Sequence, residues 1–98
     1  MENHKREEII ALYDIYGNLL TEKQRNYFED YYYLDLSISE IADNYSISRN
    51  GVFDQLKRVC AILEEYESKM KLNDKYNRID KLDINDNIKE EVFNILKE

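Results

Sequence analysis

The sequence predicts an all-α protein, a bundle of helices followed by a C-terminal helical arm. Three observations predict this class. Apolar residues recur three and four positions apart along most of the 98 residues, which is the spacing of one helix face. Two capping boxes mark helix starts in the first half of the chain. The chain has no proline and only two glycines, so it lacks the tight turns of a β-sheet protein.

The first helix is predicted from an apolar series at helical spacing: Ile9, Leu12, Tyr13, Tyr16, Leu19 and Leu20. Glu7 and Glu8 are expected in its first turn, where carboxylates suit the positive end of the helix dipole. Gly17 destabilises a helix by about 1 kcal/mol relative to alanine, so we expect this helix to end near Asn18.

A second helix is expected over residues 22–32 or 22–33. Thr21 and Gln24 form its capping box, because the threonine hydroxyl can accept from the backbone N–H three residues on while the glutamine side chain reaches back. Three aromatic residues mark its inner side: Tyr27, Phe28 and Tyr31. The three consecutive tyrosines at 31–33 cannot all face inward on a helix, so at least one is expected at the surface.

A short helix and a long helix follow. Ser37 and Glu40 form a second capping box, and Ser48 is a natural N-cap for the long helix after a break at residues 45–48. One face of the short helix is apolar: Ile38, Ile41, Ala42 and Tyr45. The long helix is predicted over about residues 49–72 or beyond. Its apolar face comprises Val52, Leu56, Val59, Leu63, Tyr66 and Met70.

The C-terminal arm carries a weaker signal. Helical spacing persists through Leu72, Tyr76, Ile79 and Leu82, which allows the long helix to continue to about Asp80. A final helix is expected from about Asp86 to Lys97. We therefore divide the chain into a helical domain over 1–72 and a C-terminal helical arm over 73–98.

The short and long helices match a helix-turn-helix over about residues 38–57. That motif needs a small residue where the helices cross, a turn residue four positions on, and a branched apolar residue facing the core; Ala42, Ser46 and Val52 stand at these offsets. Four apolar residues are expected to fill the remaining inward positions: Ile38, Ile41, Ile47 and Leu56. Glycine often occupies the turn, so Ser46 must accept the strained backbone there.

Seven residues at the start of the long helix are candidates for nucleic-acid binding: Ser48, Arg49, Asn50, Phe53, Asp54, Lys57 and Arg58. Arg49 and Asn50 should face outward and are chemically suited to guanine and adenine edges. Lys57 and Arg58 are better suited to phosphates.

The acidic net charge of the chain argues in part against nucleic-acid binding. The chain has 14 basic and 21 acidic residues, a net charge of −7, and residues 34–63 alone hold three basic and four acidic groups. Affinity for DNA depends on a basic surface, which Arg49, Lys57 and Arg58 can supply locally if they cluster while the acids point away. Otherwise these residues form an ordinary solvated face.

Several segments resemble known bacterial proteins. Residues 20–25 (LTEKQR), 39–42 (SEIA) and 47–49 (ISR), with the apolar series of the long helix, are similar to the fourth region of sigma factors, which reads the −35 promoter element. Residues 7–72 also resemble the YlxM family, notably at 31–35 (YYYLD), 52–54 (VFD), 56–58 (LKR) and 63–67 (LEEYE). The resemblance implies an all-helical, DNA-binding protein that takes part in the signal recognition particle pathway.

Two classes of partner follow. The first is DNA, bound by a regulatory protein. The alternative is a protein–protein or ribonucleoprotein interaction module that docks on the particle's GTPase or RNA, without sequence-specific DNA binding. Tyr66 and Met70 lie beyond the reach of the preceding short helices, so they should pack on the C-terminal segment or on a second copy, which predicts a homodimer.

The composition favours no enzyme and no cofactor. A single histidine and a single cysteine make neither a zinc site nor a nucleophile–base pair, and no glycine-rich phosphate loop is present. Cys60, beside Val59, is expected to be a buried apolar residue. The lone thiol, the polar start of the chain and the short apolar runs predict a cytoplasmic protein with no membrane partner.

Overall fold

The computed structural model describes the backbone of residues 3–98 and the side chains from Lys5 onward. Residues 1–2 of the expected domain 1–72 lie outside the described residues. Over the described range the chain is helical and contains no strand, which confirms the all-α prediction. The elements in order are α1 (Asn3–Tyr16), the short 3-10 helix η1 (Gly17–Leu19), α2 (Glu22–Tyr32), α3 (Ile38–Tyr45), α4 (Arg49–Met70), α5 (Leu72–Asp80) and α6 (Asp86–Lys97).

The predicted helix starts in the middle of the chain are confirmed. Thr21 and Ser37 each accept from the backbone N–H three residues on, and Gln24 and Glu40 complete the two capping boxes. Ser48 caps α4 by accepting from the N–H of Gly51 at 2.9 Å. Each such cap stabilises its helix by about 1 kcal/mol.

The first helix differs from its prediction. α1 begins at Asn3, so Glu7 and Glu8 do not lie in its first turn, and it ends at Tyr16 before the 3-10 turn. The early start is stabilised by Arg6, whose guanidinium donates to the carbonyl oxygen of Tyr32 at 2.8 Å. This long-range contact holds the first turns of α1 against the end of α2.

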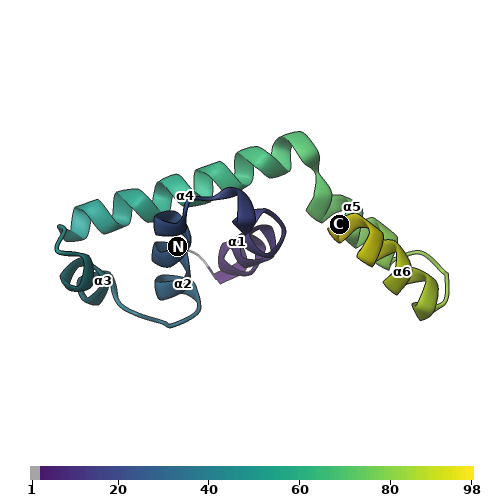
Figure 1. The fold of residues 1–98 in the computed structure, drawn as a ribbon, viewed down its shortest axis with the longest axis horizontal. Coiled ribbons are helices and arrows are strands. Elements are labelled where there is room, and N and C mark those ends of the chain that lie inside the picture. The colour runs from purple at the N-terminus through teal and green to yellow at the C-terminus, as the bar shows by residue number, and fades with distance from the viewer. Residues whose placement is uncertain (1–2) are drawn as a thin grey trace.

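Two hydrophobic clusters form the core, and α4 contributes to both (Figure 1). The first joins α1, α2 and the middle of α4: Ile9, Leu12, Tyr16, Leu20, Phe28, Tyr32, Val59 and Leu63. The second joins α2, α3 and the start of α4: Tyr27, Ile41, Ala42, Val52 and Leu56. Helices α1, α2 and α3 therefore all pack on the apolar face of α4.

The inner side of α2 differs by one position from its prediction. Tyr32 is buried, whereas Tyr31 is half-buried and Tyr33 is 44% exposed. Tyr32 is four residues after Phe28 and stacks on its ring, with centroids 4.4 Å apart. The expectation that one tyrosine of the three reaches the surface is confirmed.

The long helix ends at Met70 and does not continue to Asp80. Lys71 adopts a left-handed conformation with φ 55°, which ends α4 and bends the chain into α5. α5 and α6 then form an antiparallel hairpin beside the end of α4 (Figure 1), in which no residue is fully buried. The predicted bounds of the final helix, Asp86–Lys97, are confirmed.

Tyr66 packs on the first helix, whereas the sequence predicts packing on the C-terminal segment or a second copy. Its ring centroid lies 5.8 Å from that of Tyr16, because the end of α1 reaches the second half of α4. Met70 remains 41% exposed. Among the described residues, no helix has the length and apolar character needed to cross a membrane.

Candidate nucleic-acid interface

α3 and the start of α4 form a helix-turn-helix, as the sequence predicts. α3 packs across the beginning of α4 (Figure 1), and the three residues 46–48 connect them. Ala42 is 5% exposed at the crossing, and Val52 and Leu56 are fully buried beneath it. The close approach of the helices depends on the small side chain of Ala42, since a larger one would collide with α4.

The turn is closed by a Schellman motif with serine in the position that glycine usually fills. Ser46 has φ 55° and ψ 42°. The N–H of Ile47 donates to the carbonyl of Ala42 at 3.1 Å, and the N–H of Ser46 donates to that of Asp43 at 3.4 Å. These two bonds satisfy the last carbonyls of α3 and fix the angle at which α4 leaves.

The seven candidate residues are all exposed: Ser48, Arg49, Asn50, Phe53, Asp54, Lys57 and Arg58. They lie on the first three turns of α4, opposite the apolar face that holds Val52 and Leu56 in the core. The side chain of Ser48 is already engaged as the helix cap. The ring of Phe53 is 45% exposed, which is unusual for so large an apolar group and leaves it open to a partner.

The basic residues are spread along this surface and do not converge at one point. Successive residues of a helix are rotated by about 100°, so Lys57 and Arg58 point to different sides of α4. Arg49 and Arg58 are separated by about 13 Å along the helix axis. Asp54 lies between them. Such spacing suits contacts to several phosphates better than a single strong site.

The same basic residues take no part in the ion pairs of the described chain. Arg6 pairs with Asp35 at 3.2 Å and Lys5 lies 3.8 Å from Glu64, whereas no described acid lies within ion-pair distance of Arg49, Lys57 or Arg58. The ammonium of Lys57 lies 5.9 Å from the ring centroid of Phe53. The cations at the start of α4 are thus open to external anions.

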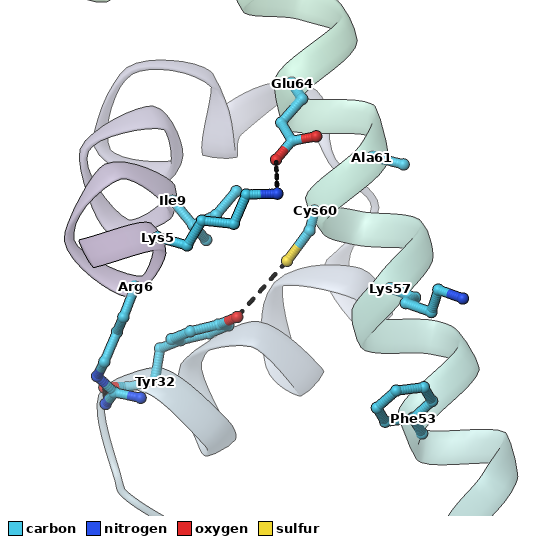
Figure 2. A pocket seen from close by; sticks show the side chains of 9 residues that line it. All are labelled: Lys5, Arg6, Ile9, Tyr32, Phe53, Lys57, Cys60, Ala61 and Glu64. Carbon is cyan, nitrogen blue, oxygen red and sulfur yellow. Dashed lines mark hydrogen bonds and ion pairs between the residues drawn. The ribbon is translucent and has the colours of Figure 1, made fainter. Parts of the chain in front are cut away.

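A cavity beside this surface was not foreseen from the sequence. It lies between α1, α2 and α4 and has a volume of about 340 Å³ (Figure 2). Its lining residues come from three helices: Lys5, Arg6, Ile9, Tyr32, Phe53, Lys57, Cys60, Ala61 and Glu64. The spacing of 53, 57, 60 and 64 along one side of α4 is the single signal for it in the sequence.

Cys60 lies in this cavity and is half-buried, which corrects the prediction of a fully buried thiol. Its sulfur lies 3.6 Å from the hydroxyl of Tyr32 (Figure 2). Burial raises the pKa of the Cys60 thiol, and burial likewise raises the pKa of the Tyr32 hydroxyl. Both groups are therefore neutral near pH 7, so Cys60 reacts slowly as a nucleophile at that pH.

Comparison with known proteins adds family relationships. The model of a family described as "UPF0122: Putative helix-turn-helix protein, YlxM / p13 like" matches residues 3–97. A UPF0122 protein of Shouchella clausii is 55% identical over 65 residues, which cover 66% of this chain and 60% of that protein. A UPF0122 protein of Staphylococcus epidermidis is 41% identical over 87 residues, covering 89% and 70% respectively. The matched segments thus span 60% to 70% of these relatives' lengths.

Proposed function

This chain belongs to the UPF0122 family of YlxM- and p13-like helix-turn-helix proteins, and from that premise we propose that it binds duplex DNA through the first turns of α4. One observation carries the proposal. The recognition helix of the motif presents Arg49, Lys57 and Arg58 to solvent, and no described carboxylate is paired with them. Elsewhere on the protein acidic residues outnumber basic ones.

The roles proposed for these side chains follow from their positions. Arg49 and Asn50 occupy the first turn of the recognition helix, where such motifs reach base edges in the major groove. Phe53 can contact a thymine methyl group from the next turn. Lys57 and Arg58 lie further along the helix and are proposed to contact phosphates on its two sides.

The salt dependence of binding tests this proposal. With two phosphate contacts, affinity should fall about 12-fold between ~50 and ~200 mM salt, and about 150-fold if two copies bind together. Lys57→Gln should reduce the slope of log affinity against log salt by about one. Arg49→Glu and Lys57→Glu should abolish binding without loss of stability, because both side chains face water.

Lys81→Glu is the matched control, since Lys81 is exposed at the end of α5, far from the motif. It should change DNA affinity by less than about threefold, the effect expected of a distant, screened charge. DNA binding that survives charge reversal at both Arg49 and Lys57 would overturn the proposed interface.

A second candidate function is favoured by the acidity of the protein. A net charge of −7 is unusual for a DNA reader and suits an interaction module. We propose the signal recognition particle, through its GTPase or its RNA, as the partner in that case. The major groove of A-form RNA is too narrow for a helix, so RNA binding should not depend on Arg49 as DNA binding does. Lack of DNA binding at ~50 mM salt, with retained affinity for the particle, supports this alternative.

We also propose that the protein forms a homodimer through its C-terminal end. Large apolar side chains remain exposed there: Met70, Leu82, Ile88, Ile95 and Leu96. α6 carries Ile88 and Ile95 seven residues apart, on one side of the helix. The apolar side of α6 is therefore not covered within one copy of the protein. A second copy carries the same apolar surface and can cover it.

A further inference from the structure

The cavity between α1, α2 and α4 has the size of a small-molecule site. Its volume of about 340 Å³ lies at the lower end of the ~300–1,000 Å³ range in which such ligands bind. It is formed by residues far apart in the sequence that converge in the folded protein (Figure 2). A ligand bound there would contact three helices at once.

The walls of the cavity are largely apolar. Ile9, 4% exposed, contributes one wall from α1, and the ring of Tyr32 contributes another from α2. The ring of Phe53 contributes a third from α4. A ligand that fills this space therefore needs an apolar body, which would be removed from water on binding.

One ammonium, that of Lys5, lies at the opening of the cavity. Lys5, Arg6 and Lys57 contribute to the lining, against the single carboxylate of Glu64. Figure 2 shows Lys5 extending across the opening toward Glu64, while the ammonium of Lys57 points away from the cavity. This balance favours a ligand that carries a negative charge near Lys5.

Lys5 and Arg6 are held differently. Arg6 is fixed by its hydrogen bond to the backbone of Tyr32 and by stacking over the same ring, at 5.1 Å from its centroid. Lys5 lies 3.8 Å from the nearest oxygen of Glu64, beyond hydrogen-bond distance, and both side chains are at least half exposed. Such an exposed ion pair contributes little to stability. An incoming anion can therefore replace Glu64 as the partner of the Lys5 ammonium.

We propose that this cavity binds a small organic anion with an apolar body. Its charged group pairs with Lys5, and its body packs against Ile9, Tyr32 and Phe53. Arg6 acts as a positioning residue, because it fixes the tyrosine ring that forms one wall. The proposal is independent of nucleic-acid binding, since neither the ligand nor its contacts require DNA.

Cys60 provides the readout, because it is the single cysteine of the chain and lies in the cavity. The probe is octanoate, a carboxylate with an apolar chain, and the reagent is iodoacetamide, which is uncharged. A ligand of this size should bind with a Kd on the order of 1 mM. At ten times its Kd, octanoate should slow alkylation of Cys60 about tenfold.

Octanol and acetate are the ligand controls. Octanol has the apolar chain without the charge, so it should protect Cys60 at most about twofold at the same concentration. Acetate has the charge without the chain and should not protect it. Equal protection by octanol and octanoate would overturn the proposal, as would no protection by octanoate.

Two variants locate the site. Lys5→Gln should weaken octanoate about tenfold, the usual effect of losing one charged hydrogen bond. Phe53→Ala removes a wall residue that is exposed to solvent, and should weaken octanoate on the order of tenfold. Lys69→Gln is the matched control, because Lys69 is also an exposed, ion-paired lysine but lies outside the cavity. Full protection that persists in both Lys5→Gln and Phe53→Ala places the ligand elsewhere and refutes the assignment.

Discussion

Ser46 holds a backbone conformation that glycine adopts more easily. A residue with a Cβ atom in the left-handed region is strained by about 1–2 kcal/mol, and Ser46 has φ 55° there. The strain persists because the two hydrogen bonds of the Schellman motif and the packing of Ile47 in the second cluster fix the turn. The orientation of α4 relative to α3 thus depends on one residue in an unfavourable conformation.

Replacing this serine should change stability in opposite directions according to the substitution. Ser46→Gly should raise the free energy of unfolding by about 0.5–1 kcal/mol, since relief of strain exceeds the greater entropy that glycine gives the unfolded chain. Ser46→Val should lower it by more than 1 kcal/mol, because a β-branched residue is least tolerated at positive φ. Urea denaturation measures both. A stabilising Ser46→Val variant would show that the turn is not left-handed.

At the scale of elements, the junction of α4 and α5 depends on a carboxylate. Glu67 accepts from the hydroxyl of Tyr16 at 2.7 Å and from the backbone N–H groups of Asn73 and Asp74 at 3.0 and 3.1 Å. The hydroxyl of Tyr16 in turn accepts from the N–H of Leu72 at 3.1 Å. Burial raises the pKa of Tyr16 to about 12, so it stays neutral at physiological pH. Glu67 and Tyr16 together cap α5 and join it to α1.

Removal of this carboxylate should release the C-terminal hairpin. Glu67→Ala leaves two N–H groups at the start of α5 without their partner and should cost about 1–3 kcal/mol. Amide hydrogen exchange should accelerate throughout α5 and α6 while α2 and α3 remain protected. Glu65→Ala is the matched control: it removes an exposed pair with Lys69 four residues on, worth about 0.3–0.5 kcal/mol. Equal effects of the two variants would contradict the capping role.

The elements that the sequence predicted well are those with local signals. Thr21 with Gln24, Ser37 with Glu40, and Ser48 each lie within three residues of the groups that they cap, so a short pattern suffices. The break after α4 has no such signal. Lysine has no preference for the left-handed conformation at position 71, and the tyrosine that completes the cap lies 51 residues before Glu67. The start of α1 could not be predicted for the same reason, because it depends on a contact between Arg6 and the distant end of α2.

At the scale of the whole molecule, the protein is an elongated body of about 50 × 24 × 21 Å with unequal ends. The end with the helix-turn-helix has a buried core, whereas the α5–α6 hairpin has no fully buried residue. Exposure of the candidate residues on α4 could be predicted, since helix periodicity defines an outer face. The cavity could not, because its walls meet through packing of three separate helices.

The exposed apolar side chains of the α5–α6 hairpin predict that the protein is a dimer. Sedimentation at micromolar concentration should give twice the 11.9 kDa mass of one chain. Ile88→Glu and Ile95→Glu should each yield monomers with unchanged helix content, because both side chains are exposed within one copy. Leu34→Glu is the matched control, an exposed leucine of the body at 64%, and should remain dimeric. A purely monomeric native protein at micromolar concentration would refute the homodimer.

The bend at Lys71 joins α4 to the C-terminal hairpin at one end, so a small rotation there moves the other end of α4 a long way. The helix has 22 residues and is about 33 Å long, with the hairpin joint at one end and Arg49 at the other. A rotation of about 10° at the joint displaces Arg49 by about 6 Å, close to two base-pair steps of duplex DNA. In the proposed dimer, the backbone conformation of Lys71, held by Glu67, would therefore set the distance between the two copies of Arg49.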